Sequence, residues 1–378
     1  MTKPNDSKIK VAMLITTLTD GGAEHYLLRT LENLDRSNFK VMVLALGPMG
    51  EVGLQIQKLG ITVIAADVSS NVGFGTKWIW ALSQLSRFRP DVCHAWMYHA
   101  MAWSIPINFL LKSRTIWSIR NGQLNQGSLP KTTLMLAKYL EKYSSKVNTI
   151  IYNSTVAQSV HERLGYDVEK SVLIHNGFDL PKYDPSEREL IRERSLKDHG
   201  LNTQDHYIGF VSRHHPQKDI ETFLRVTENL RQLNVPVKII TCGRGLGPQD
   251  AHFGAELKRH DLEEYVIPLG VVENMAHLYP CFDALLLTSK EESLPNVIGE
   301  AMAQGVICVS TRVGDVDRLL HSEQLCDVGE AIGLAQVLIQ HLNASAAEKQ
   351  VVIERQQDTL AKNFDIKIQQ EMLEDLYQ

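Results

Sequence analysis

Short runs of apolar residues alternate with helical patterns along the chain. In the first half, six runs rich in Val, Ile and Leu lie at residues 10–17, 39–46, 62–68, 91–96, 115–119 and 148–154. Most are followed by a segment in which apolar residues recur every three or four positions, as in residues 24–34 and 52–59. Apolar strands that alternate with amphipathic helices predict a parallel sheet covered by helices on both faces.

The same alternation begins again after residue 182, with runs at residues 206–212, 237–243, 266–270, 283–289 and 306–311. We therefore predict an α/β protein of two doubly wound, Rossmann-like domains, at residues 1–182 and 183–360. The polar stretch between Pro181 and Pro185 would be the linker. Residues 361–378 predict a closing helix that packs back on the first domain. Ligands of such sheets bind beyond the carboxyl ends of the strands, so the two domains would face each other across a cleft.

Composition and length agree with this picture. A chain of 378 residues is longer than one hydrophobic core usually supports, and 44% hydrophobic with 22% charged residues is typical of a globular protein. The five cysteines show no CxxC or CxxH spacing, which favours a reducing compartment over disulfides or structural zinc. The longest apolar stretch, residues 98–111, is shorter than the roughly 18–20 residues of a membrane span. We therefore expect a cytoplasmic protein.

Charge is distributed unevenly along the chain. Residues 1–182 carry a formal charge of +7 and the remainder −12. The acidic second half argues against nucleic acid as a partner, whereas the basic first half favours an anionic one.

One helical segment of the first half, residues 131–146, has an apolar and a basic face. The apolar face would hold Leu136, Tyr139, Leu140 and Tyr143, and the basic face Lys138, Lys142 and Lys146. Two interpretations fit this pattern. The segment is either an interfacial helix on the anionic inner face of the cytoplasmic membrane or an ordinary packed helix with a solvated lysine edge.

The most informative segment for chemistry is residues 289–305, which follows an apolar strand. Pro295 predicts the first turn of a helix, whose N–H groups would cradle a phosphate. Glu292 lies in the loop before this helix. Glu300 lies inside the helix, where its carboxylate could accept hydrogen bonds from ribose hydroxyls. The small residues of the helix and Asn296 favour binding of a phosphate and a ribose over a solvated acidic loop.

A second segment supplies positive charge. Arg213 and Lys218 follow the first strand of the second domain and lie beside a helix N-terminus. Two such cations can neutralise a diphosphate and stabilise the charge that develops as it leaves. Taken alone, a basic pair in a loop is more often only solvated.

Three features of the first half complete the candidate site. Gly21 and Gly22 lie between the first strand and the first helix, where they permit close approach of the backbone to a ligand. His94 ends a buried strand and fits a hydrogen-bonded core histidine. His99 lies beyond it, placed to bond a sugar hydroxyl or the reacting centre. Arg120 ends the next strand and could steer an anionic donor or acceptor.

These motifs together resemble the retaining glycosyltransferases of family 4, which have the GT-B fold. The resemblance rests on GGAE at 21–24, HxxxxHA at 94–100, IHNGFD at 174–179, the Arg/Lys loop, and E-x7-E at 292–300 followed by AMAxG. It covers nearly the whole chain, and the E-x7-E segment discriminates best. It implies transfer of a hexose or N-acetylhexosamine from a nucleotide diphosphate sugar, which we expect to be a UDP-sugar, with retention of configuration and without a metal cofactor. The implied acceptor is a glycan or lipid-linked glycan of bacterial surface polysaccharide synthesis, such as lipopolysaccharide or capsule.

The resemblance also implies residue roles. Gly22, Arg213 and Lys218 would bind the diphosphate. Glu292 would contact hydroxyls of the donor sugar, Glu300 would hold the ribose, and His99 would line the reaction centre. The remaining donor-binding positions are Gly21, Arg120, Val271, Leu294, Pro295, Asn296 and Val297. Among these, the backbone around Val271 would contact the base, and the amides of Asn296 and Val297 would contact phosphate.

The chain departs from the family pattern at two places. Asp219 follows Lys218 where the family usually has glycine, and Ser293-Leu294 replaces an aromatic residue. These departures bear on sugar specificity.

Several other motifs point elsewhere. Asp315-Val316-Asp317 matches the DxD metal motif of the other glycosyltransferase fold, but it lies in a loop of a sheet that already supplies cations. Gly243, Gly245 and Gly247 fit a tight turn near the donor. The pair His214-His215 has no third ligand at metal spacing, so no metal site is expected.

Two alternatives to transfer remain open on the sequence. One is a sugar-nucleotide epimerase of the same architecture, and the other is a catalytically silent nucleotide-sugar-binding subunit. A dehydrogenase is disfavoured, because the glycine fingerprint and its ribose-binding acid are missing.

Overall fold

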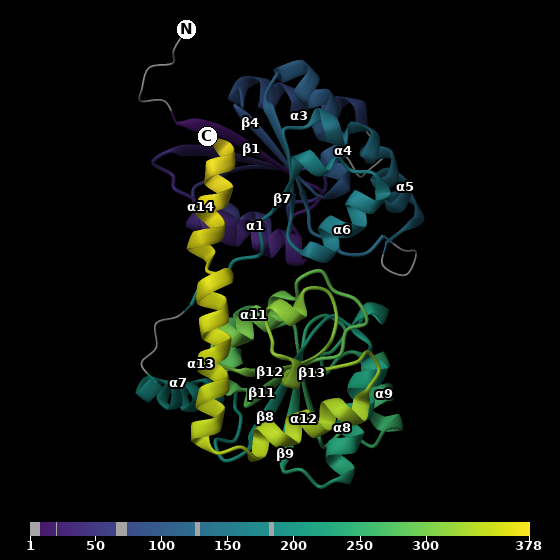
Figure 1. Cartoon of the computed structure of the whole chain (residues 1–378), viewed down its shortest axis with the longest axis vertical. Helices are drawn as coiled ribbons and strands as arrows, with labels where there is room; N and C mark the ends of the chain where they lie inside the picture. The colour runs from purple at the N-terminus through teal and green to yellow at the C-terminus, as the bar shows by residue number, and fades with distance from the viewer. Residues whose placement is uncertain (1–7, 20, 66–73, 125–128, 181–184) are drawn as a thin grey trace. The chain divides into compact units, whose positions relative to one another are not determined.

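Each half of the chain forms one parallel sheet in the computed structural model (Figure 1), which describes residues 8–19, 21–65, 74–124, 129–180 and 185–378. The chain divides into two compact units, Met1–Gly177 with Ile366–Gln378 and Phe178–Asp365. The prediction of two Rossmann-like α/β domains is confirmed. The first unit ends a few residues before residue 182, because the N–H of Phe178 already bonds the carbonyl of Phe364 within the second unit. The predicted linker from Pro181 lies outside the described residues up to Pro185, where α7 begins.

The first sheet has seven parallel strands in the order β3-β2-β1-β4-β5-β6-β7. They are β1 (Ile9–Ile15), β2 (Phe39–Ala45), β3 (Thr62–Ala65), β4 (Val92–Trp96), β5 (Arg114–Ile119), β6 (Thr149–Tyr152) and β7 (Ser171–Leu173). The helices of this unit are α1 (Gly22–Asn33), α2 (Gly50–Lys58), α3 (Phe74–Phe88), α4 (Met97–Leu111), α5 (Lys131–Leu140), α6 (Thr155–Leu164) and α14 (Ile366–Tyr377).

Alternation of side chains along β1 explains why both faces of this sheet are covered. Val11 and Met13 pack in a cluster with residues of α1, α2 and α14, whereas Ala12 and Leu14 pack with α3, α4, α5 and α6. Because neighbouring residues of a strand point to opposite faces, a continuous apolar run requires helices on both sides.

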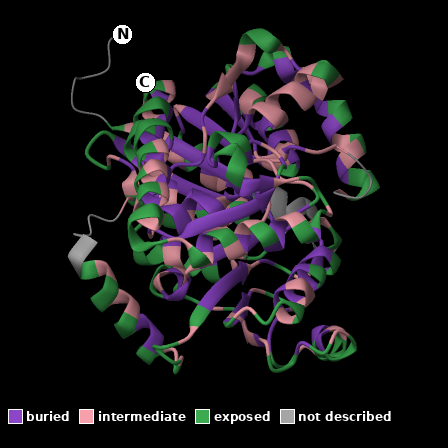
Figure 2. Ribbon diagram, turned by 60° about the horizontal axis from the view of Figure 1, so that its bottom comes forward, coloured by how far each residue is buried: buried purple, intermediate pink, exposed green. Residues whose placement is uncertain are grey.

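The second sheet has six parallel strands in the order β10-β9-β8-β11-β12-β13. They are β8 (His206–Val211), β9 (Val237–Cys242), β10 (Val266–Gly270), β11 (Ala284–Leu287), β12 (Ile307–Thr311) and β13 (Leu325–Cys326). The helices are α7 (Pro185–Asp198), α8 (Ile220–Gln232), α9 (Ala251–Arg259), α10 (Met275–Leu278), α11 (Asn296–Ala303), α12 (Ala331–Asn343) and α13 (Ala346–Asn363). The strands are mostly buried, whereas the outer faces of the helices are exposed (Figure 2).

Both sheets share one strand order, and this order locates the ligand sites. In each, the first strand of the unit lies at the centre and the chain then proceeds first to one edge and afterwards to the other. The strands that flank the point of reversal are β1 and β4 in the first sheet and β8 and β11 in the second. Ligands of open α/β sheets bind beyond the carboxyl ends of these flanking strands.

Two strands, β7 and β13, were missed by the pattern analysis. They contain three and two residues, too few for an alternation or an apolar run to be recognised. The run at residues 62–68 forms β3 as far as Ala65, and residues 66–68 lie outside the described part. All five cysteines are free.

The closing helix α14 belongs to the first unit, where a buried histidine fixes it. Nδ1 of His94 on β4 lies 2.7 Å from the hydroxyl of Tyr377, and Nε2 lies 2.8 Å from Oγ of Ser118. Burial, together with the charge of Arg120, lowers the pKa of His94 to about 3. His94 is therefore the hydrogen-bonded core histidine that its position predicted. Burial likewise lowers the pKa of His161 to about 4.

These two histidines predict an acid-sensitive first unit. Above the ordinary histidine pKa of about 6.5, these histidines are neutral in both the folded and the unfolded chain, so they do not reduce the free energy of unfolding. As the pH falls from about 6.5 towards about 4, both histidines become protonated in the unfolded chain but stay neutral in the folded unit. Protonation therefore favours the unfolded chain, and the free energy of unfolding decreases. Each histidine contributes up to about 1.4 kcal/mol per pH unit to this slope.

Urea denaturation across this pH range should show a smaller slope for His94→Gln than for the parent chain. His25→Gln, which changes an exposed histidine of the same unit, is the matched control and should leave the slope unchanged. Equal slopes for the parent chain and His94→Gln would contradict the assignment.

Candidate nucleotide-sugar site

Most of the predicted site residues follow the four strands that flank the two points of reversal, whereas Arg120 follows β5 and Val271 follows β10. In the first unit, the Gly21-Gly22 turn follows β1, and His99 follows β4. In the second unit, the Arg213–Lys218 loop follows β8, and Glu292 follows β11. Each unit therefore presents its candidate residues where open α/β sheets bind ligands.

Lys218 and Glu292 meet directly. Nζ of Lys218 lies 2.5 Å from Oε1 of Glu292, and Oγ of Ser289 donates to the same oxygen at 2.7 Å. The two side chains are only 17% and 11% exposed. This contact depends on the pairing of β8 with β11, which sets Ile208 opposite Ala284. The structure thus brings together a cation and a carboxylate that are 74 residues apart in the chain.

Backbone contacts hold the two loops in this arrangement. Oγ1 of Thr288 donates to the carbonyls of Lys218 and Asp219, at 2.9 and 3.1 Å. The N–H of Lys290 donates to the carbonyl of Gln217 at 2.8 Å. The backbone of Lys218 is therefore held by residues that follow β11 as well as by its own short 3-10 helix.

Asp219 explains one departure from the family pattern. Its backbone adopts the left-handed conformation, with φ 50° and ψ 61°, at the N-cap of α8. Glycine enters this conformation without strain, and Asp is among the few other residues that tolerate it. The carboxylate is buried, accepts from Thr222 Oγ1 at 2.7 Å, and pairs with Lys290 at 3.0 Å. These contacts compensate for the loss of glycine.

Arg213 is exposed, and its loop is held by the turn after β9. The N–H groups of Ser212 and His214 donate to the carbonyls of Cys242 and Arg244, both at 2.8 Å. A Cβ at Gly243, where φ is 123°, would lie 1.8 Å from the carbonyl oxygen of Ser212. The turn at 243–247, predicted as a tight turn, therefore fixes the backbone from which Arg213 extends.

The helix α11 begins at Asn296, so Pro295 is its N-cap and not its first helical residue. N–H groups of the first turn, including that of Val297, point along the helix axis towards the carboxyl end of β11. Leu294 is 5% exposed and packs in the core, so this predicted donor-binding residue can contribute only its backbone. Pro295 is buried and has no N–H, which leaves it a turn-forming role.

Glu300 and Val271 lie at other places around the same sheet. The hydroxyl of Tyr279 donates to Oε2 of Glu300 at 2.9 Å. Burial and the nearby Glu300 carboxylate raise the pKa of Tyr279 far above its ordinary value. The hydroxyl of Tyr279 therefore helps to position the carboxylate of Glu300. Val271 follows β10 and is exposed, so its backbone is open to a ligand.

The Gly21-Gly22 turn of the first unit is covered by a carboxylate. Gly21 is the extended N-cap of α1, and a Cβ there would lie 2.5 Å from Oε2 of Glu24. Oε1 of the same glutamate accepts from Thr17 Oγ1 at 2.9 Å. A side chain at position 21 would thus displace the carboxylate of Glu24, while Gly22 is exposed at the start of α1.

His99 follows a strained elbow between β4 and α4. The strand passes into the helix without a loop, and Met97 takes a positive φ of 68°. A bulky residue in this region is an outlier that often marks a functional site. His99 is exposed two residues later, and desolvation of one side of its ring lowers its pKa. Its imidazole is therefore neutral at pH 7.

Arg120 is placed by contacts within the first unit. Its guanidinium lies 4.0 Å from the ring centre of Tyr26 and 4.5 Å from that of Trp96, and Nη1 donates to Oδ1 of Asn176. Burial lowers the pKa of Arg120 to about 10. Arg120 thereby connects β5 with the IHNGFD segment, so its described contacts are structural, and its role in donor binding stays a prediction.

Two metal-like motifs have different fates. Asp315 is buried, with Oδ2 3.7 Å from Nε of Arg318, while Asp317 is exposed, so the two carboxylates of the DxD match differ sharply in solvent access. His214 differs from its prediction. The structure places His252 and Glu256 of α9, and not His215, in a group of potential ligands with it, so side chains that are distant in sequence lie together. The His252–Glu256 spacing of four residues on a helix was the available signal.

Both units of the chain are similar to known proteins. A family model described as Glycosyltransferase Family 4 matches residues 20–182, and one described as Glycosyl transferases group 1 matches residues 205–344. The chain is 30% identical over 149 residues to N-acetyl-alpha-D-glucosaminyl L-malate synthase of Bacillus anthracis, covering 39% of this chain and 38% of that protein. It is 26% identical over 243 residues to D-inositol 3-phosphate glycosyltransferase of Corynebacterium urealyticum, covering 58% and 54%. The matches thus span about half or less of these relatives.

Solved structures agree on the fold. HepE of Anabaena, crystallised with UDP and glucose, has a TM-score of 0.82 at 21% identity, covering 97% of this chain and 99% of that one. Sucrose-phosphate synthase of Thermosynechococcus elongatus has a TM-score of 0.79 at 15% identity, covering 98% of each chain. The fold is that of the GT-B glycosyltransferases. With two family models that between them cover most of its length, the chain belongs to the glycosyltransferases of family 4.

The conformation of Asp219 gives a prediction about stability. Asp219→Gly removes the left-handed strain but also the contacts to Thr222 and Lys290, so the free energy of unfolding should change by no more than about 1 kcal/mol. Asp219→Val loses the same contacts and places a β-branched residue at φ 50°, so it should cost about 2–3 kcal/mol. Urea denaturation measures both, and equal stability of the two variants would show that the backbone can leave this conformation.

Proposed function

We propose that the protein is a retaining, metal-independent glycosyltransferase that moves a hexose or N-acetylhexosamine from a UDP-sugar to a lipid-linked glycan. The observation that carries this proposal is the meeting of Lys218 and Glu292 at the carboxyl ends of β8 and β11. Support for the donor comes from HepE, which has been crystallised with UDP and with UDP-glucose. The acceptor would belong to bacterial surface polysaccharide synthesis, such as lipopolysaccharide or capsule.

The charges of the second unit suit departure of a diphosphate. As the bond from the anomeric carbon to the diphosphate oxygen breaks, negative charge grows on that oxygen. Arg213, Lys218 and the N-terminus of α11 would stabilise this charge. The acceptor oxygen bonds the anomeric carbon on the same face, and its proton passes to the leaving diphosphate. This front-face displacement retains configuration without an enzyme nucleophile.

Glu292 favours this route over a covalent intermediate. A double displacement, as in retaining glycosidases, needs a carboxylate that attacks the anomeric carbon. One oxygen of Glu292 already accepts hydrogen bonds from Lys218 and Ser289, which withdraw electron density from it. We therefore assign Glu292 to hydroxyls of the donor sugar and His99, as a neutral imidazole, to the reaction centre.

The role of Lys218 is tested by its removal. Lys218→Ala should lower kcat by about 100- to 1,000-fold, because the lysine acts on charge that exists mainly in the transition state. The donor dissociation constant should change by less than about 10-fold. A panel of UDP- and GDP-sugars, screened by thermal stabilisation, first identifies the donor, and kcat and the dissociation constant are then measured with it.

The matched control is Lys238→Ala, which removes a lysine of the same unit that bonds only the carbonyl of Glu264 among the described residues. Equal losses in turnover and donor binding for Lys218→Ala would count against a transition-state role. Release of an epimer without acceptor would identify an epimerase. Donor binding with neither transfer nor donor hydrolysis would identify a silent binding subunit.

The interfacial helix proposed for residues 131–146 takes a different form in the structure. The α-helix ends at Leu140, and a 3-10 helix, η1, follows at Glu141–Lys146. Leu140 is fully buried, and Leu136 and Tyr143 pack against the core of the first unit. The predicted apolar face is thus mainly the core face, as in the ordinary packed helix. None of the described helices has the length and hydropathy of a membrane span.

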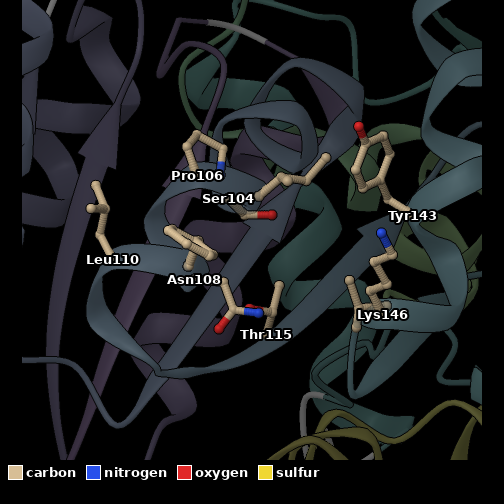
Figure 3. A pocket seen from close by; sticks show the side chains of 10 residues that line it. Ser104, Pro106, Asn108, Leu110, Thr115, Tyr143 and Lys146 are labelled. Carbon is tan, nitrogen blue, oxygen red and sulfur yellow. The ribbon is translucent and has the colours of Figure 1, made fainter.

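A neighbouring surface nevertheless supports contact with a membrane. A pocket of about 600 Å³ lies between the C-terminal part of α4 and η1, with apolar walls that include Ile105, Phe109 and Val147 (Figure 3). Phe109 and Leu110 are 85% and 58% exposed. Lys146 lines the same pocket. Lys138 and Lys142 are exposed on the same segment. Apolar side chains next to lysines suit the surface of an anionic membrane, and the pocket suits a chain of the lipid-linked acceptor.

Vesicle flotation tests this surface. The protein should float with phosphatidylglycerol vesicles at low salt and less so at high salt, because part of the attraction is electrostatic. Phe109→Asp should reduce binding by about 10-fold or more, since burying one Phe side chain contributes about 1.5–3 kcal/mol. Leu190→Asp, at an exposed leucine outside this surface, is the matched control. Absence of salt-sensitive flotation, or equal loss in both variants, would remove membrane contact from the proposal.

A further inference from the structure

Three potential metal ligands lie together on the second unit, outside the Lys218–Glu292 pair. They are His214 in the loop after β8 and His252 and Glu256 on α9. One ligand atom from each lies within 4.8 Å of the other two. Among the described residues, no second group of three or more His, Cys, Asp or Glu side chains brings its ligand atoms this close together.

The distances suit a small ion. Nε2 of His214 lies 2.8 Å from Oε2 of Glu256, and Nε2 of His252 lies 3.5 Å from Oε1 of the same carboxylate. A tetrahedral zinc ion with bonds of about 2.0–2.2 Å keeps its ligand atoms about 3.3–3.6 Å apart. His252 and Glu256 already lie at this spacing, whereas the hydrogen-bonded His214 and Glu256 must separate slightly to admit the ion. His252 is 74% exposed and can rotate to complete the set, whereas His214 and Glu256 are only 22% and 15% exposed.

Local structure fixes two of the three ligands. His252 and Glu256 are four residues apart on α9 and therefore share one helix face. The N–H of His214 bonds the carbonyl of Arg244, and a Cβ at Gly245 would lie 2.7 Å from Cβ of His214. The glycine thus leaves room for the histidine, and the edge of Phe253 supports its ring. His214 is held facing α9 before any ligand binds.

We propose that His214, His252 and Glu256 bind a divalent transition-metal ion, zinc in particular, with solvent as the remaining ligand. Two imidazoles and one carboxylate favour zinc over magnesium or calcium, which prefer sites made of oxygen alone. The ion connects α9 to the loop that carries Arg213, and so stabilises the backbone beside the phosphate-binding residues. It is a structural ion and takes no part in sugar transfer.

Zinc uptake by the untagged, metal-stripped full chain tests the site. Titration of zinc against a chromophoric chelator should show one more bound ion in the parent chain than in His252→Ala. This variant keeps the fold, since the side chain is largely exposed. Loss of this ligand should weaken that binding by roughly 100-fold or more, since loss of an outer-shell partner alone costs about 10–100-fold. Glu256→Gln should weaken it as well, while magnesium and calcium should not bind there.

The chain offers a matched control in His260, whose Nδ1 lies 2.7 Å from Oε1 of Glu228. This pair resembles the His214–Glu256 contact, but the described residues add no third potential ligand to it, so His260→Ala should leave zinc uptake unchanged. X-ray absorption of the zinc-loaded chain should show two imidazoles and oxygen ligands. The proposal is overturned if the parent chain and His252→Ala bind zinc with the same stoichiometry and affinity, or if His260→Ala loses the ion equally.

Discussion

The parallel pairing of β8 with β11 is the constraint on which the candidate site depends. Strands of a parallel sheet end at one edge, and the reversal of strand order leaves the space beyond these two ends open. Lys218 and Glu292 follow these ends, so they meet although they are distant in sequence. The same pairing lets the hydroxyl of Thr288 donate to the backbone carbonyls of Lys218 and Asp219. A change that displaced β11 would therefore move the lysine, not only the glutamate.

The Lys218–Glu292 contact also sets the electrostatic behaviour of the site. Each side chain is mostly shielded from water, so removing either partner leaves the other charge poorly solvated. A diphosphate that approaches the lysine competes with the carboxylate for the same ammonium group. The glutamate is then released towards other hydrogen-bond donors, and hydroxyls of the donor sugar are suitable ones. In the proposed function, binding of the phosphates and binding of the sugar would thus be coupled through one ammonium group.

Sequence patterns predicted the parts of the structure that repeat along the chain. Long apolar runs gave both sheets, and the loops after them gave Lys218 and Glu292, because position after a strand determines position in space. The surface that the apolar face of α5 contacts was harder to predict, because a helix that packs on its own domain and one that lies on a membrane have the same spacing of apolar residues. Leu140 belongs to the core, and only the structure shows it. His252 was missed because its partnership with His214 arises from the packing of α9 and not from spacing along the chain.

Net charge is a weaker guide to the site than local charge. The second half of the chain is strongly acidic, yet it holds Arg213 and Lys218, the cations assigned to the diphosphate. Exposed charges separated by more than about 8–10 Å are largely screened at physiological salt, whereas a partly buried cation acts at contact distance. An anionic donor therefore responds to the two cations and the helix end nearby, not to the surplus of carboxylates over the rest of the surface. In the proposed membrane contact, the basic excess of the first half would act differently, because a membrane is itself an extended charge that can interact with many exposed lysines at once.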